Sequence, residues 1–138
     1  MKRITAILTV DDNGGIGFDG KRQSRDREIV KDICTSLEGK IYMNEYSAKL
    51  FGEYADRIEV CDNPILKCAD GCACFLEGQG IGAYIENIDR VILYKWNKVY
   101  PADKYFDAID VLEAGNLAQT KEFNGFSHDK ITKEVYRI

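Results

Sequence analysis

The chain has 138 residues, of which 45% are hydrophobic and 30% charged, and this ordinary globular balance predicts a single domain over residues 1–138. Its net charge of −4 and its pI of about 5.1 argue against an extended nucleic-acid surface and favour a small-molecule ligand or a protein partner. No apolar run approaches the ~18 residues of a spanning helix, so we expect no membrane insertion. The N-terminus, MKRITAILTVDD, is typical of a first strand rather than a signal peptide, so we expect a cytoplasmic protein with reduced thiols, as a monomer or homodimer.

The first half of the chain alternates between strand and helix patterns. Residues 3–10, RITAILTV, are β-branched and apolar, which predicts a buried strand followed by a glycine-rich loop over 11–23. Ser24 is a good N-cap, and the apolar spacing after it predicts a helix over 24–37. The elements expected next are a strand at 40–43, a helix at 44–55, a strand at 57–60, a loop at 61–71 and a strand at 72–77.

The second half predicts how the sheet closes. A glycine turn opens a short helix within 78–88, and the strand 89–96, DRVILYKW, is apolar enough in its middle to be central and covered on both faces. The segment 105–109 favours a short edge strand, while 114–123 and 131–138 alternate with period two and predict a closing hairpin. This order indicates a three-layer α/β domain with a mixed, mostly parallel sheet and a C-terminal antiparallel hairpin.

A dense charge cluster stands at the start of the first helix. In one interpretation it forms an anion site at a helix N-terminus, with Asp26 aimed at a cleft. In the other it is a solvated helix start containing an Arg–Asp pair. The residues assigned to this substrate or anion site are Arg22, Gln23, Ser24, Arg25 and Arg27.

Two further turns lie where open α/β sheets bind ligands. The first, Asn44 to Ser47, follows a strand, and we favour an N-cap role for Asn44 over ligand contact, although one residue can serve both. The second, Glu77 to Gly82, is rich in glycine but lacks the G-x-G-x-x-G spacing, so it predicts either a ligand-binding turn or a bare turn.

The cysteines and the single histidine raise two other kinds of site, a metal centre and a hydrolase triad, and we favour neither. Four cysteines fall within 61–74, but they lack the C-x-x-C spacing of metal knuckles, so we favour buried or half-buried thiols over a metal site. His128 lies in a Ser-His-Asp string, and neighbours in sequence do not form a hydrolase triad, so we predict that it caps the hairpin turn. Trp96 is expected in the core.

The order of these motifs resembles the dihydrofolate reductases. Val10-Asp11 followed by Ile16-Gly17 resembles the first strand and flexible active-site loop of that family. The stretches KIYMNEYSAKLF and RIEVCDNP resemble its second strand-to-helix turn and the strand after it. CFLEGQGIGAYIENIDRVILYKW resembles the segment with its dinucleotide-contacting glycine pair, and EFNGFSHDKITKEVYRI resembles its closing hairpin.

The resemblance implies hydride transfer from NADPH or NADH to a pterin-like heterocycle. It implies that Asp26, or as a weaker candidate Glu28, is the catalytic carboxylate, and that the Ile16-Gly17 loop closes over the site. The cofactor-binding residues that it implies are Ile16, Gly17, Asn44, Glu45, Tyr46, Ser47, Gly78, Gln79 and Gly80.

The chain departs from the family pattern at functional positions. Glu45 stands where a cation is expected beside a cofactor phosphate, and a gapless alignment places Ile29 at the position of the carboxylate. The alternative is therefore a non-catalytic scaffold that binds a nucleotide-like anion or a protein partner. Several stretches also resemble short bacterial proteins, some labelled ribonuclease Z, but that metallohydrolase needs several histidine ligands and this chain has one histidine.

Overall fold

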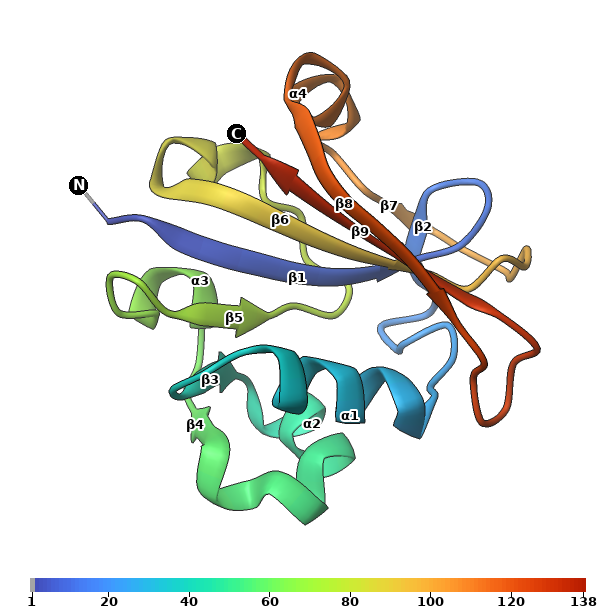
Figure 1. Ribbon diagram of the computed structural model, residues 1–138, viewed down its shortest axis with the longest axis horizontal. Helices are drawn as coiled ribbons and strands as arrows, with labels where there is room; N and C mark the ends of the chain where they lie inside the picture. Colours follow the sequence, from blue (N-terminus) through green and yellow to red (C-terminus); the bar gives the residue numbers. More distant parts are fainter. Residues whose placement is uncertain (1) are drawn as a thin grey trace.

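The structure is a computed structural model and describes residues 2–138 (Figure 1). The strands are β1 (Ile4–Val10), β2 (Gly15–Gly17), β3 (Ile41–Met43), β4 (Ile58–Val60), β5 (Ala73–Phe75), β6 (Ile88–Lys95), β7 (Lys104–Tyr105), β8 (Asn116–Phe123) and β9 (Ile131–Arg137). The α-helices are α1 (Arg27–Ser36), α2 (Glu45–Ala48), α3 (Pro64–Lys67) and α4 (Ile109–Ala114), and the 3-10 helices are η1 (Lys49–Arg57) and η2 (Gly82–Asn87).

Within the described residues the main sheet has seven strands in the order β4-β3-β5-β1-β6-β9-β8. The first five of these run parallel to one another, and β9 and β8 form the antiparallel hairpin. Strands β1 and β6 lie at the centre of the sheet and are apolar on both faces, as strands covered on both sides must be. The predicted mixed sheet, central strand and closing hairpin are confirmed.

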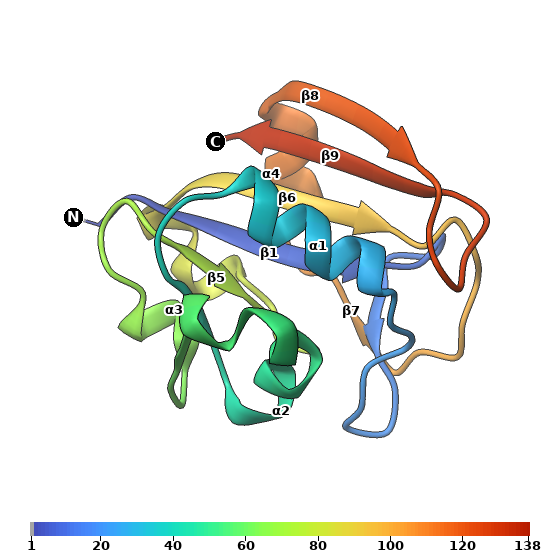
Figure 2. The same ribbon diagram turned by 60° about the horizontal axis from the view of Figure 1, so that its bottom comes forward.

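Each face of the sheet packs against its own helices, which gives the three layers. On one face Ile29 and Ile33 of α1 and Phe51 of η1 pack against the sheet. On the other face Ile65 of α3 and Leu112 of α4 belong to a second apolar cluster. Figure 2 shows α1 in front of β1 and β6, with α4 behind the sheet.

Three local predictions are wrong, each for a physical reason. The first helix begins at Arg27 and not after Ser24, because Asp26 is extended and its Oδ1 accepts the N–H of Glu28 at 2.9 Å. Residues 105–109 form no edge strand of the main sheet, since β7 pairs with β2 instead. The expected loop over 61–71 contains α3, which begins at Pro64, a residue suited to a first helical turn.

Candidate functional site

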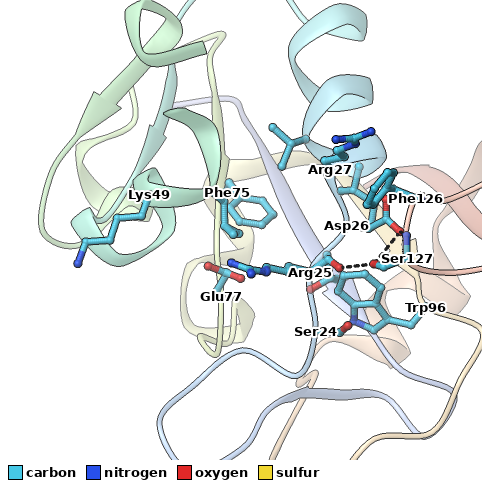
Figure 3. Close-up of a pocket in the computed structure, with 14 residues that line it drawn as sticks. Ser24, Arg25, Asp26, Arg27, Lys49, Phe75, Glu77, Trp96, Phe126 and Ser127 are labelled. Atoms are coloured by element: carbon cyan, nitrogen blue, oxygen red, sulfur yellow. Dashed lines mark hydrogen bonds between the residues drawn. The ribbon is translucent and has the colours of Figure 1, made fainter. Parts of the chain in front are cut away.

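A cavity of about 420 Å³ opens at the carboxyl edge of the sheet, and we call it the main cavity (Figure 3). It lies there because β1, β5 and β6 are parallel, so that their carboxyl ends meet beside the start of α1. Its apolar lining consists of Ile29, Val30, Leu50, Phe75, Trp96 and Phe126, and its polar lining consists of Thr9, Ser24, Arg25, Asp26, Arg27, Lys49, Glu77 and Ser127.

The charges around the main cavity favour an anion. Arg25, Arg27 and Lys49 line it, and none of the three forms an ion pair with a carboxylate of residues 2–138. The guanidinium of Arg27 lies 3.6 Å from the centre of the Phe126 ring, which keeps this cation at the rim. Figure 3 shows Lys49 on one side of the cavity, with Arg25 between it and Ser24.

The carboxylate of Asp26 lines the cavity, but its oxygens already accept hydrogen bonds from other groups of the protein. It accepts the N–H groups of Glu28 at 2.9 Å, Phe126 at 2.8 Å and Ser127 at 2.9 Å. Burial alone would raise the pKa of Asp26, but the N–H of Phe126, the ring of His128 and the other N–H donors outweigh it, so the pKa lies below its ordinary value. A buried carboxylate that stays ionised is a poor proton donor, so its proton-donating role stays a prediction that this geometry disfavours.

His128 is buried and joins three segments, which corrects the prediction of a simple turn cap. Its Nδ1 lies 2.9 Å from Oδ2 of Asp26, and its Nε2 lies 3.1 Å from Oγ of Ser24 and 2.8 Å from the hydroxyl of Tyr100. The ring stacks on Trp96, with 4.7 Å between the ring centroids. Trp96 is buried as predicted, but it also lines the cavity, and its Nε1 has no hydrogen-bond partner among residues 2–138.

A second cavity of about 360 Å³ lies between the first loop and the Gly78 turn. The two segments approach closely, because a Cβ atom on Gly17 would lie 3.4 Å from Cα of Gly78. Arg22 pairs with Glu77 here, through Nε–Oε2 at 2.8 Å and Nη2–Oε1 at 3.0 Å, and its guanidinium covers the Tyr46 ring at 4.1 Å.

The Arg22–Glu77 ion pair lies at the boundary of the two cavities, since Glu77 lines both of them and Arg22 lines the second. Ser47 reinforces it by donating to Oε1 of Glu77 at 2.8 Å. Burial alone would lower the pKa of Arg22, but the hydrogen bond and charge of Glu77 outweigh it and raise the pKa. The pair therefore stays charged at the boundary that the two cavities share.

Only some of the predicted cofactor-binding residues lie together at one cavity. The second cavity is lined by Gly17, Asn44, Tyr46 and Gly78, and Ser47 is buried beside it. Asn44 caps α2 as predicted, accepting the N–H of Ser47 at 2.8 Å. The predicted residues that line neither cavity are Ile16, which lies in the core, and Glu45, Ser47, Gln79 and Gly80.

The predicted anion-site residues also divide between places. Ser24, Arg25 and Arg27 line the main cavity, and Arg22 lines the second. Gln23 lines neither, because its side chain donates to Oδ2 of Asp11 at 3.1 Å and shapes the loop. The Glu28 side chain lies outside both cavities, as does every cysteine.

Sequence reasoning missed other residues of the site. Lys49 and Phe126 were not singled out, because each stands in a segment whose pattern predicted only a helix or a turn. All five cysteines are free thiols, and no group of three or more His, Cys, Asp or Glu side chains within residues 2–138 is arranged to hold a metal ion. No helix in that range is long and apolar enough to cross a membrane.

Comparison with known proteins supports the fold. No family model matches the chain, and no curated protein matches it in sequence. Among solved structures it is similar to a dihydrofolate reductase from Enterococcus faecalis complexed with NADP(H) and RAB-propyl, with a TM-score of 0.66. The match covers 97% of this chain and 95% of the reductase at 15% identity, so the chain has a dihydrofolate reductase-like fold. Nothing in these comparisons supports the ribonuclease Z label.

Proposed function

We propose that the protein is a small-molecule-binding member of this fold, and that its main cavity binds a flat aromatic ligand carrying an anionic group. One observation carries this proposal: an apolar lining faces three cations that have no carboxylate partner within residues 2–138. The ring would lie against Phe75 and Trp96, and the anion would lie near Arg25 and Lys49. A pterin-like heterocycle with a carboxylate tail and a nucleotide both have this chemistry.

A thermal-shift screen with folate, dihydrofolate, nucleotides and an uncharged pteridine tests this binding. We expect the anionic ligands to raise the melting temperature and the uncharged ring to do so much less. Arg25→Gln and Lys49→Gln should each weaken binding by about tenfold to a hundredfold, because a charged hydrogen bond contributes roughly 1.5–3 kcal/mol. Lys98→Gln is the matched control, since Lys98 is exposed and lines neither cavity. Equal affinities in all three variants would contradict a site at the main cavity.

Reduction with NADPH or NADH is the second candidate, and its support is the fold shared with a reductase complexed with NADP(H). The second cavity offers Lys21, Arg22 and Lys104 to a dinucleotide phosphate. Arg22 is already paired with Glu77, which weakens its attraction for a phosphate of the dinucleotide. The pKa of Asp26 also lies below its ordinary value, which disfavours proton donation by this carboxylate.

An absorbance assay separates the two candidates. A reductase consumes NADPH in the presence of dihydrofolate, whereas we expect ligand binding without turnover. Glu77→Gly is the informative variant, because it removes the ion pair and frees Arg22 for a phosphate of the dinucleotide. Dihydrofolate-dependent loss of NADPH absorbance in the unmodified protein would replace our proposal with the reductase candidate.

A further inference from the structure

We propose that Ser24, His128 and Asp26 form an acyl-transfer triad that opens into the main cavity. Oγ of Ser24 lies 3.1 Å from Nε2 of His128, and Nδ1 of His128 lies 2.9 Å from Oδ2 of Asp26. These are the contacts that connect nucleophile, base and orienting carboxylate in serine hydrolases, where geometry rather than sequence order defines the triad. Such a triad would do more than bind a ligand, because it would break a bond in the bound molecule.

The surroundings of Asp26 set the tautomer that this chemistry needs. Its side chain is fully buried, and its lowered pKa favours the ionised form, which accepts the proton on Nδ1 of His128 and leaves the lone pair of Nε2 to Ser24 and Tyr100. The three N–H donors of Glu28, Phe126 and Ser127 fix the carboxylate and therefore the plane of the ring. Stacking on Trp96 restrains the imidazole further.

The nucleophile faces space that a substrate could enter. Ser24 is half-buried and lines the main cavity, and Figure 3 shows it beside Trp96 at one side of that cavity. The backbone N–H of Arg25, the residue after the nucleophile, donates to no atom of residues 2–138. The buried Nε1 of Trp96 is likewise unpartnered within that range. The N–H of Arg25 is the donor we assign to the oxyanion that develops when a serine attacks a carbonyl group, because it belongs to the residue after the nucleophile.

The reaction balances with water as the only co-reactant. Oγ of Ser24 attacks the carbonyl carbon of an ester, and Nε2 of His128 takes the hydroxyl proton. The carbon–oxygen bond to the leaving alcohol breaks, and His128 returns the proton to that oxygen. Water then attacks the acyl-serine with His128 again as base, which releases a carboxylic acid and restores Ser24.

The substrate class follows from the charges at the cavity. Arg25, Arg27 and Lys49 favour an acyl group that carries its own carboxylate, such as the ester of a dicarboxylic acid. An uncharged acyl ester lacks this attraction and should react more slowly at the same serine.

Tyr100 gives the array a distinctive signature. Its hydroxyl lies 2.8 Å from Nε2 of His128, closer than the 3.1 Å of Ser24, so the two hydroxyls compete for one lone pair. Tyr100→Phe removes the competitor. If the three residues form a triad, Ser24 should react faster in that variant. If they form only a structural network, Ser24 should not react in either protein.

Labelling with a fluorophosphonate probe, located by peptide mass spectrometry, tests the assignment on the full chain. We expect one label on Ser24, no label in Ser24→Ala, full labelling in the distant control Ser36→Ala, and a several-fold faster reaction in Tyr100→Phe. In His128→Ala we expect labelling to be lost and partly restored by added imidazole, which a structural role of His128 would not produce. A label on Ser127 or Tyr100, or no label on the folded protein, overturns the triad.

Ester hydrolysis then tests the substrate class. The mono-p-nitrophenyl ester of succinic acid should react at least several-fold faster than p-nitrophenyl acetate, and Ser24→Ala should abolish both reactions above background. Equal rates for the two esters overturn the preference for an anionic acyl group. The Ser24→Ala protein keeps all three cations, so it still reports the ligand binding proposed above, and failure of one inference is distinguishable from failure of the other.

Discussion

The carboxylate of Asp26 shows how one side chain can hold two distant segments together. Oδ1 accepts the N–H groups of Glu28 and Phe126, while Oδ2 accepts the N–H of Ser127 and the ring of His128. In Asp26→Asn the new amide NH₂ must face one of these donor pairs. We therefore expect a loss of about 3 kcal/mol in the free energy of unfolding, measured by urea denaturation.

Asp129→Asn is the matched control for that substitution. Asp129 is exposed in the same turn, and its side chain forms no hydrogen bond within residues 2–138. Its substitution should change the free energy of unfolding by no more than about 0.5 kcal/mol. Equal losses of unfolding free energy in Asp26→Asn and Asp129→Asn would show that the specific hydrogen bonds of Asp26 do not account for its contribution to stability.

The same residues mark what local sequence signals can predict. Asn44 was predicted as a cap because its donor, Ser47, lies three residues away and the choice is local. Ser24 and Asp26 are both good caps, and the hairpin turn about Phe126 decides between them from far along the chain. No pattern near His128 reveals that its partners are Ser24 and Asp26, because the fold alone brings them together.

At the scale of elements, helix α1 is fastened to the sheet by a charge cluster at its centre. Asp32 pairs with Lys133 of β9 at 2.8 Å and Lys121 of β8 at 2.7 Å, and it accepts the hydroxyl of Tyr94 of β6 at 2.6 Å. The ammonium-bearing side chain of Lys133 is only 5% exposed, so Asp32→Ala leaves a buried charge without its carboxylate. We expect a loss of about 3 kcal/mol in urea denaturation.

Two further variants check this account of the α1 anchor. Adding Lys133→Met to Asp32→Ala removes the stranded charge and should recover much of the lost stability. Lys31→Ala changes the neighbouring exposed position of α1 and should have little effect. No recovery in the double variant would mean that packing, rather than the unpaired ammonium group, causes the loss.

The hydrophobic pattern of the sequence predicted most of the helices and strands. It failed for short strands whose pairing partner lies far away in the sequence. The long strands and the hairpin were predicted because their patterns extend over seven or eight residues, as in β6 and β9. Strands β2 and β7 have three and two residues, too few to show alternation, and they exist because each pairs with the other across the loops. These short pairings shape the second cavity, so its geometry was not predictable from sequence.

Over the whole molecule the scaffold and the chemistry of the site are separable. The fold matches a reductase over nearly its full length at 15% identity, and the main cavity lies at the carboxyl edge expected for such sheets. Sequence reasoning predicted a crevice there, because the fold fixes its place. It did not predict the ion pair of Arg22 and Glu77 at this edge, which depends on side chains from separate loops.

The same buried carboxylates should make the whole molecule sensitive to acid. Burial alone would raise the pKa values of Asp11, Asp26 and Asp32, but hydrogen bonds and nearby lysines outweigh it and lower all three. Each folded pKa therefore lies below the unfolded value of about 4, so its contribution is complete above that pH and is lost as the pH falls toward the folded pKa. We expect the free energy of unfolding to fall steeply below about pH 4. Urea denaturation from pH 7 to pH 3 measures this fall, which should be shallower in Asp26→Asn, since that variant has one fewer titrating carboxylate; parallel curves would show that Asp26 has the same pKa folded and unfolded.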